Sequence, residues 1–266
     1  MACPRLRNML DADQPAFGLW VSIADPAVVE IVAYAGFDYV NIDMEHTTLE
    51  LSMVENMCRA ASACGISALV RVPENNAKAI LRVVELGPDG IVVPRIRDAE
   101  DARQAVLAAK YAPLGERGIK AATRAARYGL DGADFVSYAA KINRELVIYA
   151  QIEDQGAIDD LEAIAGVEGI DVCGMGPADL ARALGCMGSK NDPRVGAAIT
   201  KVSQTIRRVA KAKLGIPINH GNYEFDAPAV IALGAVMINC GNDVRALTRG
   251  LTENIQRARA KLPSVA

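Results

Sequence analysis

Short apolar runs alternate with helix-like segments along the whole chain. Eight runs have the composition of strands buried on both faces, and they are Phe17 to Ser22, Tyr39 to Asp43, Ser67 to Val72, Gly90 to Val93, Val147 to Ile152, Gly169 to Gly174, Ile216 to Asn219 and Ala235 to Asn239. Between them, apolar residues recur at helical spacing, as in Pro26 to Ala35, Glu50 to Ala63, Ala77 to Leu86, Asp98 to Lys110 and Ile158 to Ala165. This alternation predicts βα units that build a parallel sheet.

Glycines between the predicted helices and strands support the same alternation. Six glycines lie between a predicted helix and the next strand, where a left-handed helix terminator is expected: Gly36, Gly65, Gly87, Gly166, Gly215 and Gly234. Two longer stretches, 111–129 and 185–192, precede predicted helices over 133–143 and 193–213. Eight βα units predict a TIM (β/α)8 barrel, as a single domain over residues 1–266, with a doubly wound open sheet as the second candidate.

Composition narrows the class of protein. A net charge of -3 and an aromatic content of 5% argue against a nucleic-acid partner. The apolar runs are far shorter than the roughly 20 residues that span a bilayer, and the N-terminus lacks the apolar core of a secretory signal, so we expect no membrane partner and a cytoplasmic location. The six cysteines form no C-x-x-C pair, so neither a disulfide framework nor a zinc knuckle is expected.

The strongest chemical signal is the segment from Asp43 to His46, which ends an apolar strand in two carboxylates and an imidazole. The chain has two histidines, His46 and His220, and histidine is the side chain best suited to move protons near neutral pH. The alternative is that Glu45 and His46 cap a helix or lie solvated in a loop. The motif by itself does not separate these two interpretations.

In a TIM barrel the active site forms where the strands end. Asp43 and His46 follow the second predicted strand, Arg71 ends the third, and Glu153 and Asp179 follow the fifth and sixth. Such charges are costly to bury unless they are paired or bind a metal.

Glu153 and Asp179 come from adjacent strands, so we expect them to bind one Mg2+, Mn2+ or Co2+ ion, with water completing the shell. A glycosidase carboxylate pair is the alternative, but few aromatics are present to stack sugars. A second alternative, for Asp179, is a place in the first turn of a helix, where a negative charge is favourable.

Five motifs then carry a resemblance to a known family. They are Asp43-Met44-Glu45-His46, Val70-Arg71-Val72-Pro73, Gly115-Glu116-Arg117-Gly118, Gln151-Ile152-Glu153 and Gly176-Pro177-Ala178-Asp179-Leu180. In this order they resemble the HpcH/HpaI aldolase family of class II, metal-dependent pyruvate aldolases, which act on 4-hydroxy-2-oxo acids. The resemblance extends from about Phe17 to Leu251.

The resemblance implies roles for five residues. Glu153 and Asp179 hold the metal, His46 is the acid/base with Asp43 as its orienting partner, and Arg71 donates to the keto or enolate oxygen. Such chemistry needs these groups, because breaking a carbon–carbon bond beside a ketone leaves an enolate that a cation and a guanidinium stabilise. No predicted strand ends in lysine, which argues against a Schiff-base mechanism.

Further residues are expected to bind substrate. The amides around Gly176, Pro177 and Ala178 open a helix and can hold a carboxylate. Gln151 lies on the same strand face as Glu153 and can steady the substrate or a water, and Trp20 can form a wall of the pocket. His220 lies in a polar turn and is left out of the catalytic set.

Several alternatives stay open. The same family includes a citrate synthase of siderophore pathways, which joins oxaloacetate and acetyl-CoA, and the Asp43–His46 motif also occurs there. A catalytically silent barrel acting as a binding subunit would need a metal or base residue to be missing. A metal-dependent hydrolase is disfavoured because the several histidine ligands of such sites are absent.

The resemblance also implies an oligomer. It suggests a hexamer built as a trimer of dimers, with the last helix, near Asp243 to Leu262, exchanged between subunits. Glu85 lies where the family places an acidic residue that approaches a neighbour's base, and the alternative is a solvated helix residue.

Overall fold

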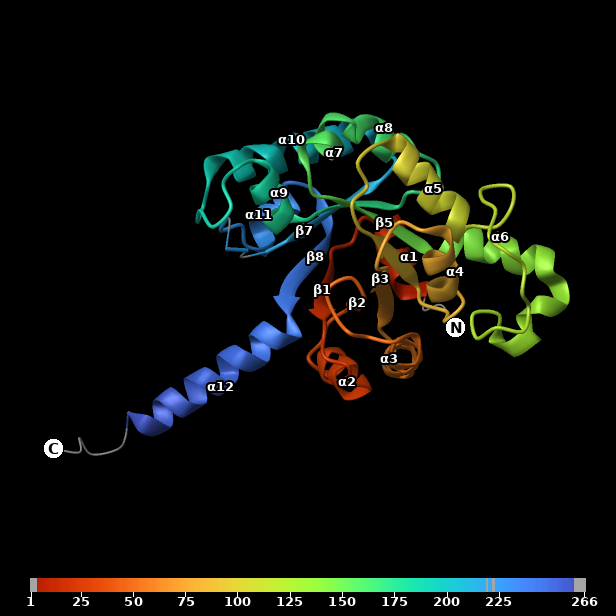
Figure 1. Cartoon of the computed structure of the whole chain (residues 1–266), viewed down its shortest axis with the longest axis horizontal. Helices are drawn as coiled ribbons and strands as arrows, with labels where there is room; N and C mark the ends of the chain where they lie inside the picture. Colours follow the sequence, from red (N-terminus) through yellow and green to blue (C-terminus); the bar gives the residue numbers. More distant parts are fainter. Residues whose placement is uncertain (1–3, 219, 222, 261–266) are drawn as a thin grey trace.

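The chain folds into a closed barrel of eight parallel strands in chain order, each followed by at least one helix on the outside (Figure 1). The computed structural model describes residues 4–218, 220–221 and 223–260. The strands are β1 (Ala16–Val21), β2 (Tyr39–Asp43), β3 (Ser67–Arg71), β4 (Gly90–Val93), β5 (Val147–Ile152), β6 (Val172–Met175), β7 (Lys213–Pro217) and β8 (Ala235–Asn242). The predicted TIM barrel is therefore confirmed.

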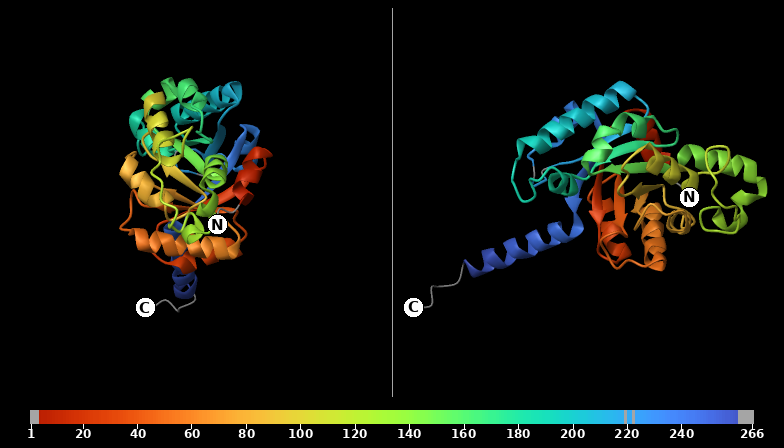
Figure 2. Two further views of the ribbon diagram at one scale, coloured as in Figure 1. Left: turned by 90° about the vertical axis from the view of Figure 1, so that its right-hand side faces the viewer. Right: turned by 45° about the horizontal axis from the view of Figure 1, so that its top comes forward.

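Apart from the last helix, the α-helices form the outer layer of the barrel or cap its ends (Figure 2). They are α1 (Pro4–Asp11), α2 (Pro26–Tyr34), α3 (Leu51–Cys64), α4 (Ala77–Val84), α5 (Ala99–Ala109), α6 (Phe135–Glu145), α7 (Gln155–Asp159), α8 (Leu161–Gly166), α9 (Pro177–Ala183), α10 (Pro193–Val209), α11 (Ala227–Ala232) and α12 (Asp243–Arg259). Two short 3-10 turns, η1 (Arg127–Gly129) and η2 (Asp131–Asp134), precede α6.

Helix α1, which the hydrophobic pattern did not predict, covers the amino-terminal end of the barrel. Leu6 and Leu10 are each 1% exposed and pack against the side chains that fill the barrel interior. Arg7 pairs with Asp171, just before β6, at 2.7 Å, and Arg5 pairs with Asp38, just before β2, at 2.7 Å. Helix α1 therefore leaves the opposite end of the barrel, at the carboxyl ends of the strands, uncovered.

A single aromatic ring determines which residues fit on two neighbouring strands. The Tyr149 side chain of β5 lies inside the barrel against β6 and β7. A Cβ atom on Gly174 would lie 1.6 Å from the Tyr149 hydroxyl oxygen, and one on Gly215 would lie 2.7 Å from it. Both positions must therefore be glycine for the ring to occupy this space.

Some predicted boundaries were wrong in the second half of the chain. β6 and β7 begin at Val172 and Lys213, not at 169 and 216. Helix α10 ends at Val209 rather than 213, because Ala210 takes the left-handed conformation with φ of 54°. The last predicted residue of the seventh strand, Asn219, lies outside the described residues, as do the final two predicted residues of the last helix, 261 and 262.

The glycine and helix predictions had mixed outcomes. Gly36, Gly65, Gly87 and Gly234 adopt positive φ as expected, whereas 166 lies within α8 and 215 lies within β7. The predicted helix over 158–165 is two shorter helices, α7 and α8, and the one over 133–143 begins at Phe135 and ends at Glu145.

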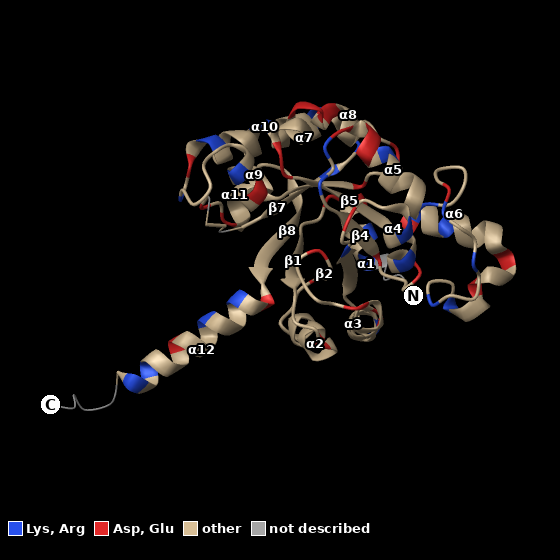
Figure 3. Cartoon of the chain, viewed as in Figure 1, with Lys and Arg blue, Asp and Glu red and all other residues tan. Residues whose placement is uncertain are grey.

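Helix α12 projects away from the barrel, as Figures 1 and 3 show. Four large apolar side chains on it are 46–60% exposed: Val244, Leu247, Leu251 and Ile255. Their spacing of three and four residues places them on one face. Arginine residues occupy other positions along the helix (Figure 3). This apolar stripe lacks a partner among the described residues.

Candidate active site at the carboxyl ends of the strands

The Asp43 and Arg71 side chains form the most buried charged contact of the rim. The two residues are register partners on β2 and β3. Arg71 Nε donates to Asp43 Oδ1 at 2.9 Å, and its second terminal nitrogen donates to Oδ2 at 2.7 Å. The side chains are 10% and 6% exposed, and Arg71 also lies 4.4 Å above the Trp20 ring. The guanidinium is thus fixed by a two-point contact and an aromatic face.

The turn after β2 also depends on Asp43. Its Oδ1 accepts the backbone N–H groups of Glu45, at 3.0 Å, and His46, at 3.4 Å, and the Thr47 hydroxyl donates to its carbonyl oxygen. Burial works against the charged carboxylate, but the hydrogen bonds and charge of Arg71 and these backbone amides lower its pKa overall. Asp43 therefore stays ionised and holds both Arg71 and the loop.

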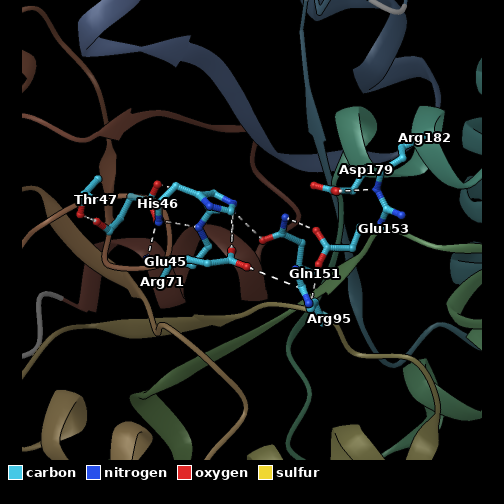
Figure 4. Close-up of polar contacts among 10 residues, drawn as sticks. Glu45, His46, Thr47, Arg71, Arg95, Gln151, Glu153, Asp179 and Arg182 are labelled. Atoms are coloured by element: carbon cyan, nitrogen blue, oxygen red, sulfur yellow. Dashed lines mark hydrogen bonds and ion pairs between the residues drawn. The ribbon is translucent and has the colours of Figure 1, made fainter. Parts of the chain in front are cut away.

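Glu45, not Asp43, is the carboxylate beside the His46 ring (Figure 4). Its Oε2 lies 3.5 Å from His46 Nε2 and 3.2 Å from a terminal nitrogen of Arg71. Its Oε1 lies 4.0 Å from Arg95 Nε. The His46 side chain is 60% exposed and Glu45 is 11% exposed. The expected contact between Asp43 and His46 is thus made through the histidine backbone, and Glu45, which the sequence left without a role, faces the imidazole.

Gln151 and Glu153 continue the polar row on β5. Gln151 Nε2 donates to Glu153 Oε2 at 2.6 Å, and Arg71 donates to Gln151 Oε1 at 3.5 Å. The other carboxylate oxygen of Glu153 accepts the Arg95 backbone N–H at 2.8 Å. Arg95 has a positive φ of 54°, so its unusual backbone aims the amide at Glu153. Nothing in the hydrophobic pattern or the motifs pointed to Arg95.

Glu153 lies among other negative charges. Burial raises the pKa of Glu153 to about 7, although the Arg95 amide opposes the rise, and the nearby carboxylates of Asp179 and Glu45 push it further. Asp179, in the first turn of α9, is 44% exposed and pairs with Arg182 at 3.2 Å. Figure 4 shows Gln151 and Glu153 between His46 and Asp179.

The residues present fit an oxygen-binding cation. Two carboxylates, Glu153 and Asp179, border the same cavity, and the charges of Asp179 and Glu45 add to the burial that raises the pKa of Glu153, so a cation would favour its ionised form. Mg2+ is held in proteins by one or two carboxylates plus water and substrate oxygens. Within the described residues no group of three or more His, Cys, Asp and Glu side chains could hold a metal, so water and substrate would supply the other ligands.

Two cavities meet at this cluster and share His46 and Asp179. The larger, of about 890 Å³, is open and charged, with Glu45, Arg95 and Glu153 in its wall. The smaller, of about 310 Å³, is lined by Trp20, Asp43, Arg71, Gln151 and the segment from Met175 to Asp179. All of the substrate-binding residues expected from the sequence therefore line one cavity.

The segment after β6 closes tightly on Glu153. A Cβ atom on Gly176 would lie 2.8 Å from Glu153 Oε2 and 3.0 Å from Gln151 Nε2, so only glycine fits there. The Gly176 N–H donates to the Ile152 carbonyl at 2.9 Å. Pro177 has no N–H, so the amides that remain for a ligand are those of Ala178 and Asp179.

Other residues of the smaller cavity were missed because they lie in segments that read as ordinary strand or helix. Asn239 and Asn242 come from β8, Arg245 from α12, and Ser22 follows β1. His220, left out of the catalytic set, also lines this cavity and stacks on Tyr223 at 5.9 Å between ring centroids.

No lysine among the described residues lines either cavity. Lys110 is 1% exposed, and burial lowers its pKa to about 8, a value that would suit a Schiff-base lysine. However, its ammonium donates to the carbonyls of Asn143, at 2.8 Å, and Leu146, just before β5 begins. It therefore lies at the amino-terminal end of the barrel, away from Arg71 and Glu153.

A parallel barrel with a fixed guanidinium, an exposed histidine and two carboxylates at its strand ends has the parts of an enzyme active site. A model of the family described as HpcH/HpaI aldolase/citrate lyase matches residues 16–248, and this chain belongs to that family.

Relatives with assigned activities cover almost the whole chain. The 5-keto-4-deoxy-D-glucarate aldolase of Klebsiella pneumoniae is 32% identical over 258 residues, which are 95% of this chain and 97% of that protein. The pyruvate aldolase of Rhizobium etli is 35% identical over 244 residues, which are 92% and 93% of the two chains. Both are named as aldolases.

Solved structures agree with this fold. The HpcH/HpaI aldolase of Desulfitobacterium hafniense has a TM-score of 0.89 at 29% identity, covering 98% of each chain. The citrate synthase SbnG has a TM-score of 0.86 at 26% identity, covering 97% of this chain and 98% of its own. Enzymes that break and enzymes that form carbon–carbon bonds are thus both similar to this chain.

Proposed function

We propose that this chain is an aldolase that reversibly cleaves a 4-hydroxy-2-oxo acid to pyruvate and an aldehyde, using a divalent metal ion. The observation that carries the proposal is the buried Arg71 guanidinium, which Asp43 and Glu45 hold at the mouth of a cavity that also contains Gln151 and His46. Its position suits a donor to an oxyanion that develops on a keto oxygen. The aldolase names of relatives over most of the chain support the same reaction.

Glu153 and Asp179 are the residues that would hold Mg2+, Mn2+ or Co2+. When bound, such an ion supplies positive charge that lowers the energy of an enolate. Arg95 supports this role indirectly, because its backbone N–H fixes one oxygen of Glu153. Gln151 fixes the other.

The protein groups account for the movement of protons. His46 accepts the proton of the 4-hydroxyl as the bond between C3 and C4 breaks, and the aldehyde leaves. The electron pair of that bond moves into the enolate of pyruvate, whose oxygen accepts hydrogen bonds from Arg71. Return of a proton to C3 gives pyruvate. Glu45, 3.5 Å from His46 Nε2, orients the imidazole for both transfers.

Binding of the oxo acid uses the segment after β6. The N–H groups of Ala178 and Asp179 suit the substrate carboxylate, and Gly176 permits close approach. The Trp20 ring, 4.4 Å from the centre of the Arg71 guanidinium, helps to fix that group.

The proposed function is tested with a coupled assay for pyruvate across a series of 4-hydroxy-2-oxo acids, with and without Mg2+, Mn2+ or Co2+. Metal-dependent release of pyruvate from one or more acids is expected. The similarity to SbnG favours a second candidate, citrate synthase-type chemistry. Citrate formed from oxaloacetate and acetyl-CoA, with no pyruvate from any acid, would replace the first proposal by the second. Neither activity, together with no bound divalent metal, would point to a binding subunit.

The apolar stripe on α12 supports a homo-oligomer in which this helix packs on a neighbouring subunit. A hexamer built as a trimer of dimers is the arrangement we propose. Among the described residues, no helix is long and apolar enough to cross a membrane. The cytoplasmic location expected from the sequence stays a proposal.

Glu85 has a partner within its own chain. Its Oε1 accepts a hydrogen bond of 2.8 Å from the guanidinium of Arg117, whose side chain is 1% exposed. The contact is at the carboxyl end of α4, the end remote from the rim. A role of Glu85 beside the base of a neighbouring subunit stays a proposal that depends on the oligomer.

A further inference from the structure

Asn239, in β8, has a buried side-chain donor for which the described residues supply no acceptor. The residue is 6% exposed and lines the smaller cavity. Its Oδ1 accepts the backbone N–H of Gly241 at 3.0 Å. Its Nδ2 is buried and has no hydrogen-bond partner among the described residues.

The orientation of this amide is fixed by the backbone. Because the Gly241 backbone N–H can only donate, the Asn239 atom that faces it must be the oxygen, and the NH2 group must face the other way. Gly241 has a φ of 107°, a conformation that glycine adopts readily. A buried donor without an acceptor destabilises the fold, so its retention on a cavity wall suggests that a ligand supplies the acceptor.

Arg245 lines the same cavity from the first turn of α12. Its guanidinium takes part in no hydrogen bond or ion pair within the part of the chain that the structure describes, whereas Arg71 in the same wall is held by Asp43. A cation in the first turn of a helix is unfavourable for the helix itself. Helix stability therefore does not explain Arg245.

The first turn of α12 is anchored to the rim, although the rest of the helix projects. Asp243 is 6% exposed, and its Oδ2 accepts the backbone N–H groups of Ser22 and Ile23, each at 2.9 Å. These residues directly follow β1. The anchor keeps Arg245 beside the cavity whatever α12 packs against.

We propose that Asn239 determines substrate specificity by donating a hydrogen bond from Nδ2 to an oxygen substituent of the substrate other than its 2-oxo acid group. This inference rests on the proposed function and deepens it, because it states which substrates that site prefers. The substituent is either a hydroxyl, bound by Asn239, or a carboxylate, bound by Asn239 together with Arg245. It belongs either to the oxo-acid donor or to the aldehyde.

The test measures kcat/KM for carbon–carbon bond formation with matched partners. Pyruvate and hydroxypyruvate are compared as donors with acetaldehyde, and acetaldehyde, glycolaldehyde and glyoxylate are compared as acceptors with pyruvate. Asn239→Asp keeps the acceptor for Gly241 and removes the donor. It should lower kcat/KM about tenfold to a hundredfold for the partner that carries the additional hydroxyl or carboxylate, and little for the matched partner that lacks this group. The partner affected identifies which half of the substrate carries the substituent.

Arg245→Gln then shows whether the substituent is a hydroxyl or a carboxylate. Arg249→Gln, one turn later on α12, is the matched control. A loss confined to glyoxylate assigns a carboxylate, and unchanged kcat/KM for a hydroxyl-bearing partner that Asn239→Asp impairs assigns a hydroxyl. Equal losses for all partners, or none, in Asn239→Asp would overturn the inference. Asn239→Ser repeats the test if the aspartate variant does not fold.

Calorimetry of binding separates this inference from the proposed function. Titrations with pyruvate, hydroxypyruvate, glycolaldehyde and glyoxylate, with Mn2+ present, need no turnover. A wild-type protein without activity on any pairing contradicts the aldolase proposal, while weaker binding of an oxygen-bearing compound by Asn239→Asp still supports the subsite. An active wild type with no oxygen-dependent difference in rate or binding contradicts the subsite alone.

Discussion

Asp43 and Arg71 are joined side by side across β2 and β3 by two hydrogen bonds, of 2.9 Å and 2.7 Å, so that one carboxylate fixes the whole plane of the guanidinium. A lysine in place of Arg71 could not make both bonds or lie flat on Trp20. Arg71→Lys should therefore lower kcat/KM about a hundredfold to a thousandfold, the usual loss of an oxyanion donor. The matched control is Arg59→Lys, an exposed α3 arginine that pairs with Glu55. Equal kcat/KM in wild type and Arg71→Lys would refute the role.

The same pair predicts how stability depends on pH. The pKa of Asp43 is lowered below its ordinary value of 3.8, so the ionised carboxylate stabilises the fold at higher pH, and this stabilisation is lost as pH falls through the lowered value. Asp43→Asn should cost about 3 kcal/mol near neutral pH, because it removes the main partner of a buried Arg71.

Thermal unfolding of wild type and Asp43→Asn between pH 2.5 and 7 measures this effect. The difference in Tm should be constant above about pH 5 and shrink on the acid side. Curves that stay parallel down to pH 2.5 would mean that Asp43 is not the titrating group.

Metal binding should depend on Glu153 and Asp179. Because a metal ion contributes several kcal/mol to the stabilisation of such a transition state, Glu153→Ala or Asp179→Ala should lower activity about a thousandfold or more. Mn2+ should raise the Tm of wild type and not of the variants, since a ligand stabilises only a fold that binds it. Glu162→Gln, at an exposed ion pair on α8, is the control. Full activity in either alanine variant would remove the proposed metal site.

The raised pKa of Glu153, about 7, has its own consequence in metal-free protein. The folded pKa exceeds the ordinary value of 4.5, so ionising Glu153 destabilises the fold increasingly from about pH 4.5 to 7 and fully above that range. Metal-free Glu153→Gln should then unfold at a higher temperature than wild type at pH 8, and at the same temperature near pH 4. A lower Tm for the variant at pH 8 would contradict this.

Glu45 should act through His46, whose ring it faces. Glu45→Gln should lower kcat about tenfold, and His46→Ala should lower it far more, since a positioned base contributes about a hundredfold or more. In a double-mutant cycle, adding Glu45→Gln to His46→Ala should cause little further loss. Fully additive losses would assign Glu45 to Arg71 instead, which it also contacts at 3.2 Å.

The stripe on α12 should govern assembly. Leu247→Glu or Leu251→Glu places a charge on the exposed apolar face and should lower the molar mass in light scattering coupled to gel filtration. Ala246→Glu adds the same charge about half a helical turn away and should leave the mass unchanged. Identical masses for all three variants would show that this face does not hold subunits together.

The barrel could be predicted because its determinants are local. Each strand is a short apolar run and each helix has its own period, so the alternation is visible without tertiary information. Helix α1 escaped prediction because it is short and buries only Leu6 and Leu10 fully, with Met9 partly buried beside them. The end of α10 was misjudged because Ala210, not a glycine, takes the left-handed conformation.

The sequence predicted which residues lie together at the candidate site, but not which of their side chains are in contact. The rule that active sites form at strand ends places Asp43, Arg71 and Glu153 together. It does not say which side chains touch, because that depends on strand register and on the turn after β2. Register joins Asp43 to Arg71, and the turn leaves Glu45 beside the imidazole. Asn239 was overlooked because it ends the apolar run of the predicted eighth strand, and no other reactive residue type in that run pointed to a site.

The Tyr149 ring inside the barrel makes the residues allowed at Gly174 and Gly215 depend on the residue at position 149. While the tyrosine is present, no mutation at Gly174 or Gly215 adds a side chain without a collision. Natural variation or a mutant library should thus yield folded proteins with larger residues at these glycines only where Tyr149 has been replaced by a smaller residue first. The order in which these substitutions occur, and not only their identity, therefore determines which variants can fold at every step.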